Sequence, residues 1–190
     1  MNGNLAYQDW RREELVGGKV VMISPAATNH NITSGNIFYI FKDYLRGKHC
    51  IPFPDGATVY LTDEDHFVPD MMVVCDRSKV RPDGVHGAPD LVVEVLSSST
   101  AKNDRTYKKD VYEQCGVQEY WLVSPSEKFI EVYWLDGGKY VLSDIYALPA
   151  GWQIKQMTDK EKAAVVTEFK CHLYDDLTIH LDDIFDDLFS

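Results

Sequence analysis

Apolar residues recur along this chain with two spacings, one typical of helices and the other typical of strands. Between residues 31 and 46 they recur near helical spacing, which predicts an amphipathic helix that ends at a glycine. A second helix is expected from about 100 to 115, because hydroxyl side chains at 97–100 can cap it and Gly116 follows it. A short helix is also predicted over residues 8–15.

Shorter apolar runs separated by turn residues predict the strands. Strands are expected over residues 19–23, 57–61, 68–75, 90–96, 119–123, 129–135 and 140–146, and a closing strand or short helix within 165–188. Gly137-Gly138 between the last two runs is a hairpin signal. The pattern predicts a single α/β domain over residues 1–190, a mixed β-sheet flanked by helices, with a core from about 14 to 150 and a closing segment from about 151 to 190.

Length and composition place the chain among ordinary globular domains. No run approaches the roughly 20 apolar residues of a membrane span, and the polar N-terminus does not resemble a secretory signal. A cytoplasmic location is therefore expected. The four cysteines are scattered, so reduced thiols are the expectation, and Cys171-His172 lacks a second ligand pair with zinc spacing.

The net charge of −11 argues against a broad nucleic-acid surface. Six aspartates lie between residues 174 and 190, whereas Lys102, Arg105, Lys108 and Lys109 cluster within eight residues. A local basic cluster in an acidic chain fits a confined anionic substrate. A solvated basic helix face remains the alternative.

Two carboxylates on predicted neighbouring strands are the first chemical signal. Glu94 lies in an apolar strand whose two faces both read as buried, and burial of a carboxylate requires a partner or a metal. Asp70 follows Pro69 at the start of another apolar strand. Such oxygen ligands suit a hard divalent cation. A lysine paired with Glu94 only for packing is the alternative, and residues 63–65 are expected to form a solvated turn.

The helix after Glu94 supplies the next signal. Asp104, Lys108 and Tyr112 are spaced by four and share one helix face, so Lys108 can reach back towards Glu94. A lysine there could stabilise a phosphoryl-transfer transition state or orient the attacking water. An Asp104–Lys108 pair on the surface is the alternative, and Lys109 is expected to be solvated.

The stretch APDLVVEVLSSSTAKNDRTYKKDVYEQCGVQEYWLVSP resembles the Uma-two family of restriction endonucleases, within the PD-(D/E)XK nuclease superfamily. Upstream, EELVGGKVVMISPAATNHN resembles the family's first segment through Glu14, Pro25 and His30, and VPDMMVV resembles its first acidic motif through Asp70. The likeness runs from about Glu14 to Leu188. It implies a restriction-endonuclease-like fold.

The resemblance also implies a site and an activity. It makes Asp70 and Glu94 the expected ligands of Mg²⁺, for which Mn²⁺ can substitute. Lys108 is the expected active-site lysine, and Glu14 is an added carboxylate from the first helix. Leu96 stands where the wider superfamily has its lysine; Lys108 matches the family's displaced lysine, and Lys102 is the other candidate. Glu13 competes with Glu14, and a solvated helix end is the alternative.

Other residues are left with two readings each. His30 could contact substrate or serve structure, and Glu119 could face Lys108 or lie at the rim. The aromatic residues of the core and interfaces are expected to be Tyr112, Tyr120, Trp121, Tyr133 and Trp134.

Three functions compete at this point. The first is an Mg²⁺-dependent endonuclease that hydrolyses phosphodiester bonds of DNA and works as a two-fold homodimer. The second is a nuclease-fold protein that binds nucleic acid or a partner with weak or lost catalysis. The third is an oligomeric scaffold built through free strand edges and the aromatic strand at 131–134. No motif that reads bases is visible, so the sequence does not identify the target.

Overall fold

A computed structural model describes residues 12–189 of the 190-residue chain. A six-stranded mixed sheet forms its centre, in the order β12-β11-β10-β9-β6-β3. Its strands are β3 (Ile51–Pro54), β6 (Met71–Val74), β9 (Leu91–Val95), β10 (Glu119–Ser124), β11 (Phe129–Asp136) and β12 (Lys139–Ala147). β9 and β10 run parallel, and the other neighbours are antiparallel. The chain is mixed α/β, as the sequence predicted.

The parallel pair at the centre needs a crossover connection, and a helical segment supplies it. It consists of α2 (Ala101–Asn103), a π-helical segment η2 (Asp104–Lys108) and α3 (Lys109–Cys115). This confirms the helix expected from about 100 to 115. Gly116 ends it in the left-handed conformation at φ 86°, which glycine adopts without steric cost.

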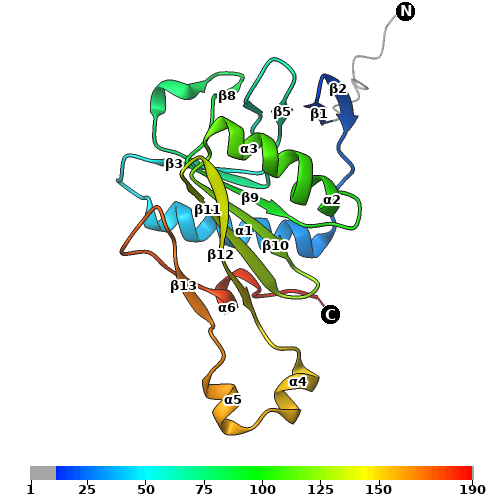
Figure 1. Ribbon diagram of the computed structural model, residues 1–190, viewed down its shortest axis with the longest axis vertical. Coiled ribbons are helices and arrows are strands. Elements are labelled where there is room, and N and C mark those ends of the chain that lie inside the picture. The colour runs from blue at the N-terminus through cyan, green and yellow to red at the C-terminus, as the bar shows by residue number, and fades with distance from the viewer. Residues whose placement is uncertain (1–11, 190) are drawn as a thin grey trace, which may run out of the picture.

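A second sheet of short strands lies beside one end of the central sheet, in the order β2-β1-β5-β4-β8-β7 (Figure 1). Its strands are β1 (Glu13–Val16), β2 (Lys19–Met22), β4 (Val59–Tyr60), β5 (His66–Phe67), β7 (Val80–Arg81) and β8 (Gly84–His86). A 3₁₀ turn, η1 (Arg77–Lys79), precedes β7. The helix predicted over 8–15 is wrong where it can be checked, because residues 13–16 pair with β2 and β5, and residues 8–11 lie outside the described part.

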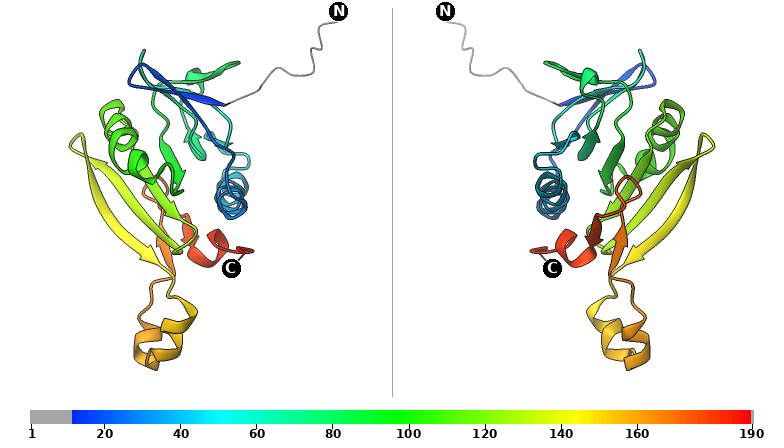
Figure 2. Two further views of the ribbon diagram at one scale, coloured as in Figure 1. Left: turned by 90° about the vertical axis from the view of Figure 1, so that its right-hand side faces the viewer. Right: turned by 90° about the vertical axis from the view of Figure 1, so that its left-hand side faces the viewer.

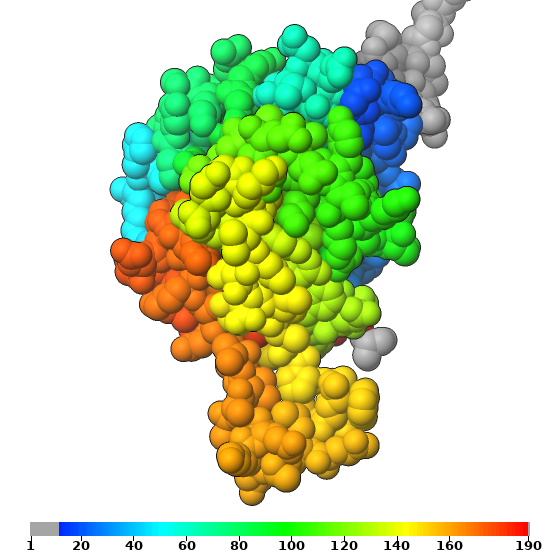
Figure 3. Space-filling view, viewed as in Figure 1, coloured from blue at the N-terminus to red at the C-terminus, as the bar shows by residue number. Residues whose placement is uncertain are grey.

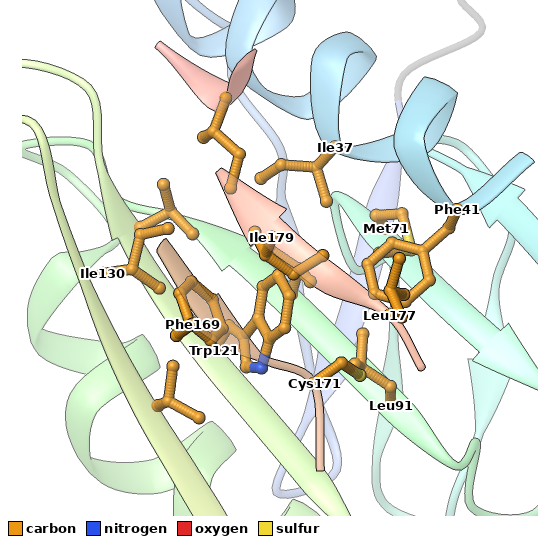
Figure 4. Close-up of a cluster of buried hydrophobic side chains, with 14 of the residues drawn as sticks. Ile37, Phe41, Met71, Leu91, Trp121, Ile130, Phe169, Cys171, Leu177 and Ile179 are labelled. Carbon is orange, nitrogen blue, oxygen red and sulfur yellow. The ribbon is translucent and has the colours of Figure 1, made fainter. Parts of the chain in front are cut away.

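Both faces of the central sheet are covered, which explains why β9 reads as a continuous apolar run (Figure 2). Helix α1 (Thr28–Tyr44) packs on one face, where Ile37 and Phe41 meet Trp121 of β10 (Figure 4). The crossover helix covers the other face, where Tyr112 and Tyr120 join the second apolar cluster. Side chains of β9 therefore alternate between two buried layers.

The C-terminal segment completes the first of these layers. β13 (Glu168–Lys170) pairs with β14 (Thr178–His180), and α6 (Leu181–Ile184) follows, so Phe169 and Ile179 join the cluster under α1. This agrees with the closing segment expected near the end of the chain. Before it, α4 (Gly151–Gln156) and α5 (Asp159–Ala163) project from the body (Figure 3).

The expectation of four reduced cysteines is wrong. Cys50 and Cys75 form a disulfide, because they flank the paired strands β3 and β6 and therefore face each other across the ladder. The sequence offered no CxxC spacing that could reveal a pair 25 residues apart. Cys115 and Cys171 are free thiols. No helix in residues 12–189 is both long and apolar enough to cross a bilayer.

Candidate active site at the end of the central sheet

Asp70 and Glu94 lie side by side where β6 begins and β9 ends. The antiparallel register pairs Met71 with Val93, and continuing it by one residue sets Asp70 opposite Glu94. Directly opposed residues on antiparallel strands point to the same face of a sheet. Val92, two residues before Glu94, belongs to the cluster under the crossover helix, so both carboxylates face that helix.

Lys108 reaches this face from the π-helical segment. Its Nζ lies 3.1 Å from Oε1 of Glu94, 2.7 Å from Oε1 of Glu14 and 3.8 Å from Oδ1 of Asp104. The side chain is only 5% exposed, so the surface pair considered for Asp104 and Lys108 is excluded. Lys102, the other candidate lysine, is exposed. The contact between Lys108 and Glu94 that helix spacing allows is therefore present.

Glu14 arrives from a strand, not from a helix. Besides Lys108, its Oε1 accepts a hydrogen bond from the backbone N–H of Val68 at 2.8 Å, which fixes the carboxylate against the chain leading to β6. Glu13 points to solvent, as alternation along a strand requires. The helical reading failed because a charged, polar run of this length carries no strand periodicity.

Asp65 anchors the hairpin that carries Glu14. It accepts hydrogen bonds from the backbone N–H of Gly17 at 3.0 Å and from Tyr107 Oη at 2.9 Å. Asp65 is buried, so the solvated turn expected at residues 63–65 is wrong for this residue. Its bonds tie the β1–β2 hairpin to the crossover helix, which brings Glu14 and Lys108 together.

His30 lies beside Asp70, in the first turn of α1. Its Nε2 is 3.3 Å from Asp70 Oδ2, and that oxygen also accepts the backbone N–H of Val95 at 2.6 Å. The Nδ1 atom of His30 is buried and has no hydrogen-bond partner among residues 12–189. The sequence did not decide between a substrate contact and a structural role for His30. Its partner Asp70 is 40 residues away, and local sequence does not reveal a contact over that separation.

Two tyrosines expected in the core also bond to site residues. Tyr112 donates from Oη to Glu94 Oε1 at 2.8 Å, and Tyr120 donates to the backbone carbonyl of Asp104 at 2.9 Å. Burial raises the pKa of both phenols well above the ordinary value. They therefore act as hydrogen-bond donors that hold the acidic groups in place.

Charge in this site is unbalanced towards the negative. Burial raises the pKa of Glu94 well above its ordinary value. The charge of Lys108 lowers this pKa, but the negative charges of Asp104, Asp70 and Glu14 raise it further. Burial likewise raises the pKa of Asp104 to about 6. Burial alone would lower the pKa of Lys108, but the surrounding carboxylates outweigh it and raise the pKa, so the lysine stays charged.

Neither position considered for Glu119 is correct. It is fully buried on the opposite face of the sheet, far from Lys108, and accepts hydrogen bonds from the Trp121 side chain and the backbone N–H groups of His172 and Leu173. Cys171 also donates to it. Burial raises the pKa of Glu119 although these donors lower it. The C-terminal segment buries this face of β10. The two positions expected from the sequence, one facing Lys108 and one at the rim, did not include the buried position of Glu119.

The donor chemistry of the site fits a hard divalent cation. Mg²⁺ typically takes one or two carboxylates from the protein and fills its shell with water and substrate phosphates. Asp70 and Glu94 offer such oxygens, and Asp104 Oδ1 is a buried oxygen without a hydrogen-bond partner in the described chain. Within residues 12–189 no three Asp, Glu, His or Cys side chains are already grouped around one point.

Comparisons with known proteins identify the family of this chain. A family model described as "Uma2: Putative restriction endonuclease" matches residues 5–161. An uncharacterized protein of Synechocystis sp. is 30% identical over 133 residues, which cover 68% of this chain and 70% of that protein. A second from the same organism is 27% identical over 120 residues, or 61% of this chain and 68% of that protein.

A solved structure shares the fold. The crystal structure of "a putative nuclease belonging to DUF820" from Anabaena variabilis superposes with a TM-score of 0.63, covering 91% of this chain and 89% of that one at 16% identity. At this identity the likeness supports the nuclease fold alone. Since the family model spans most of the chain, the protein belongs to the Uma2 family of putative restriction endonucleases.

Proposed function

We propose that this protein is a divalent-metal-dependent endonuclease that hydrolyses phosphodiester bonds of DNA. The observation that carries the proposal is the buried Lys108 ammonium set between the carboxylates of Glu94 and Glu14, next to Asp70. Catalytic groups that must handle charge are commonly placed where burial and neighbours shift their pKa values. Asp70 and Glu94 are the metal ligands of the proposal, with Mg²⁺ as the cation and Mn²⁺ as its substitute.

Each residue has a distinct role in this proposal. A bound cation would neutralise charge on the scissile phosphate. Lys108 presents an ammonium that can stabilise negative charge as it develops on the phosphoryl oxygens. Glu14 and Tyr112 hold Lys108 and Glu94 in position through their hydrogen bonds. Val95 N–H and His30 hold the Asp70 carboxylate.

One observation favours a second candidate, a nuclease-fold protein that binds nucleic acid or a partner with weak or lost catalysis. Three carboxylates surround Lys108, so its charge is largely satisfied without substrate. The net charge of −11 also weakens any general attraction to DNA. The proposals differ in one measurable respect, which is metal-dependent strand cleavage.

Nicking of supercoiled plasmid in Mg²⁺ tests the endonuclease proposal. Asp70→Asn, Glu94→Gln and Lys108→Ala should each lose about a hundred- to a thousand-fold in rate, the usual cost of one electrostatic group. Lys102→Ala is the matched control on the exposed side of the same helix and should cut like the wild type.

Stability must be measured alongside activity. Lys108→Ala leaves buried carboxylates unpaired, which typically costs about 3–5 kcal/mol, so urea unfolding decides whether its loss of nicking reflects chemistry. Asp70→Asn avoids this difficulty because Asp70 makes no ion pair with Lys108. A folded Asp70→Asn variant that nicks at the wild-type rate would overturn the site. A wild type without metal-dependent cleavage would favour the binding protein.

A further inference from the structure

A basic cavity lies at the other end of α1 from the proposed active site. Its volume is about 610 Å³, and four of its nine lining residues are cations, namely Lys42, Arg46, Lys48 and Arg77. Across the chain only 19 of 190 residues are lysine or arginine. No carboxylate lines the cavity. In so acidic a chain, this concentration of positive charge marks a place for an anion.

These cations are available to a ligand. Within residues 12–189, Lys42 and Arg77 form no ion pair with a carboxylate. Arg46 pairs with Asp43 at 3.0 Å and Lys48 lies 3.7 Å from Asp176, but both pairs are exposed. Exposed ion pairs contribute about 0–1 kcal/mol, so a phosphate can displace their partners at little cost.

The wall of the cavity is held in place by the fold. Arg77 donates from Nε to the backbone carbonyl of His49 at 2.8 Å, which joins the two segments that line the cavity. The disulfide joins Cys50, a lining residue, to Cys75, two residues before Arg77. A preorganised cationic surface loses less entropy on binding than one built from free side chains.

Helix α1 joins this cavity to the proposed active site. His30, beside Asp70, lies in its first turn, and Lys42 lies in its last turn. Asn31, Gly35 and Tyr39 form an exposed face between them at spacings of four. A Cβ at Gly35 would meet nothing within 4 Å, so this face is open to a ligand.

The distance suits the backbone of a duplex. His30 and Lys42 are 12 residues apart on this helix, which is about 18 Å at 1.5 Å per residue. One DNA strand advances 3.4 Å per nucleotide, so this length corresponds to roughly five base pairs. Figure 3 places the segment after α1 and the β1–β2 hairpin at opposite edges of the body.

We propose that this cavity binds a backbone phosphate of the duplex DNA that is cut at Asp70 and Glu94, roughly five base pairs from the cut. This inference rests on the proposed function, since it assigns the cavity to the same substrate. It makes substrate binding depend on duplex length on one side of the cut. It also explains how an acidic chain retains an anionic polymer, because positive charge is concentrated in this cavity.

Fluorescence anisotropy of labelled duplex DNA in EDTA, where the proposed cleavage does not proceed, tests the inference. The pair Lys42→Glu and Arg46→Glu should weaken binding of a 30-base-pair duplex at least tenfold. The cavity holds one phosphate in this proposal, so losing that contact should reduce the magnitude of the slope of log K against log salt by about 0.9. Lys160→Glu and Lys162→Glu, on exposed α5, make the same charge change and should bind like the wild type.

The outcomes separate the two proposals. If the wild type nicks plasmid but the cavity pair binds duplex as tightly as the control pair, the inference is overturned and the endonuclease proposal stands. If wild type and control neither bind nor cut duplex DNA, the proposed function itself fails. A free anion is the other source of phosphate: tight binding of pyrophosphate, lost in the cavity pair while duplex binding is unchanged, would also overturn the inference.

Discussion

Lys108 carries a single positive charge into a buried group of carboxylates. Its ammonium contacts Glu14 and Glu94 directly and Asp104 at longer range. Removing water strengthens every such interaction, so the carboxylates raise the pKa of Lys108, and Asp70 and Glu14 add to the raised pKa of Glu94 and Asp104. The site therefore favours one bound proton or one bound cation more than its separate residues would.

Asp104 allows a test of this charge imbalance. In the folded chain its pKa is about 6 rather than the ordinary 3.8, so the folded state holds the proton more tightly than the unfolded state. This residue therefore favours folding fully below about pH 4 and loses that contribution as the pH rises through 6.

Replacement of Asp104 by Asn should remove that part of the pH dependence. At 1.36 kcal/mol per pKa unit, Asp104 should lower the free energy of unfolding of the wild type by up to about 3 kcal/mol between pH 4 and pH 7. The Asp104→Asn variant should not show this decrease. Urea unfolding from pH 4 to 7 measures this, with Asp110→Asn as an exposed control on the same helix. Parallel pH profiles for wild type and Asp104→Asn would contradict the assignment.

At the scale of elements, the strand β9 and the crossover that follows it bring the site together. Both faces of β9 are covered, so its side chains are apolar except for Glu94. The Glu94 carboxylate is tolerated there because Lys108 of the crossover helix donates a hydrogen bond to it. The π-helical turn from Asp104 to Lys108 widens the helix there, a feature often found at functional sites. On the other face, Glu119 of β10 accepts hydrogen bonds from the C-terminal segment.

Glu119 should fasten that segment to the sheet. In Glu119→Ala the buried Trp121 Nε1 and the N–H groups of His172 and Leu173 lose their acceptor, at about 1–3 kcal/mol for each unsatisfied group. We expect faster amide hydrogen exchange at residues 168–180 than in the wild type. Glu168→Ala, exposed on β13, is the control. Uniform exchange in both variants would show that packing alone holds the segment.

At the scale of the whole molecule, the central sheet ends in a long, uncovered edge strand. β12 lies at that edge, and Leu142 and Ile145 are exposed large apolar side chains. The neighbouring α4 exposes Trp152. Unpaired strand edges with apolar side chains tend to find a partner. We propose a two-fold homodimer through this edge, which also suits the proposed cleavage of duplex DNA.

Light scattering at tens of micromolar should give twice the 21.7 kDa chain mass. Leu142→Lys together with Ile145→Lys should give the monomer mass, because charges on an edge strand oppose pairing. Val20→Lys with Val21→Lys places the same charges on β2, an edge of the second sheet, and should remain dimeric. A wild-type monomer would refute the dimer, and a dimer that survives both pairs would place the interface elsewhere.

Elements whose signal is local could be predicted without the structure. Helix α1, the crossover helix, β9 and the β11–β12 hairpin follow from apolar spacing, capping residues and glycines, which act over a few neighbours. Local spacing also set Lys108 on the helix face that returns to Glu94. That the lysine missing at Leu96 lies on this helix was implied by the family resemblance, and Lys108 does contact Glu94.

Features that depend on contacts between distant residues became visible only in the folded chain. Glu14 lies on a strand because residues 13–16 find partners in β2 and β5, and His30 meets Asp70 only once α1 is laid along the sheet. The Cys50–Cys75 bond follows from the ladder of β3 and β6. Glu119 faces away from Lys108 because both faces of β10 are covered. The hydrophobic pattern predicts that a side chain is buried. Which residues it contacts depends on how the elements pack.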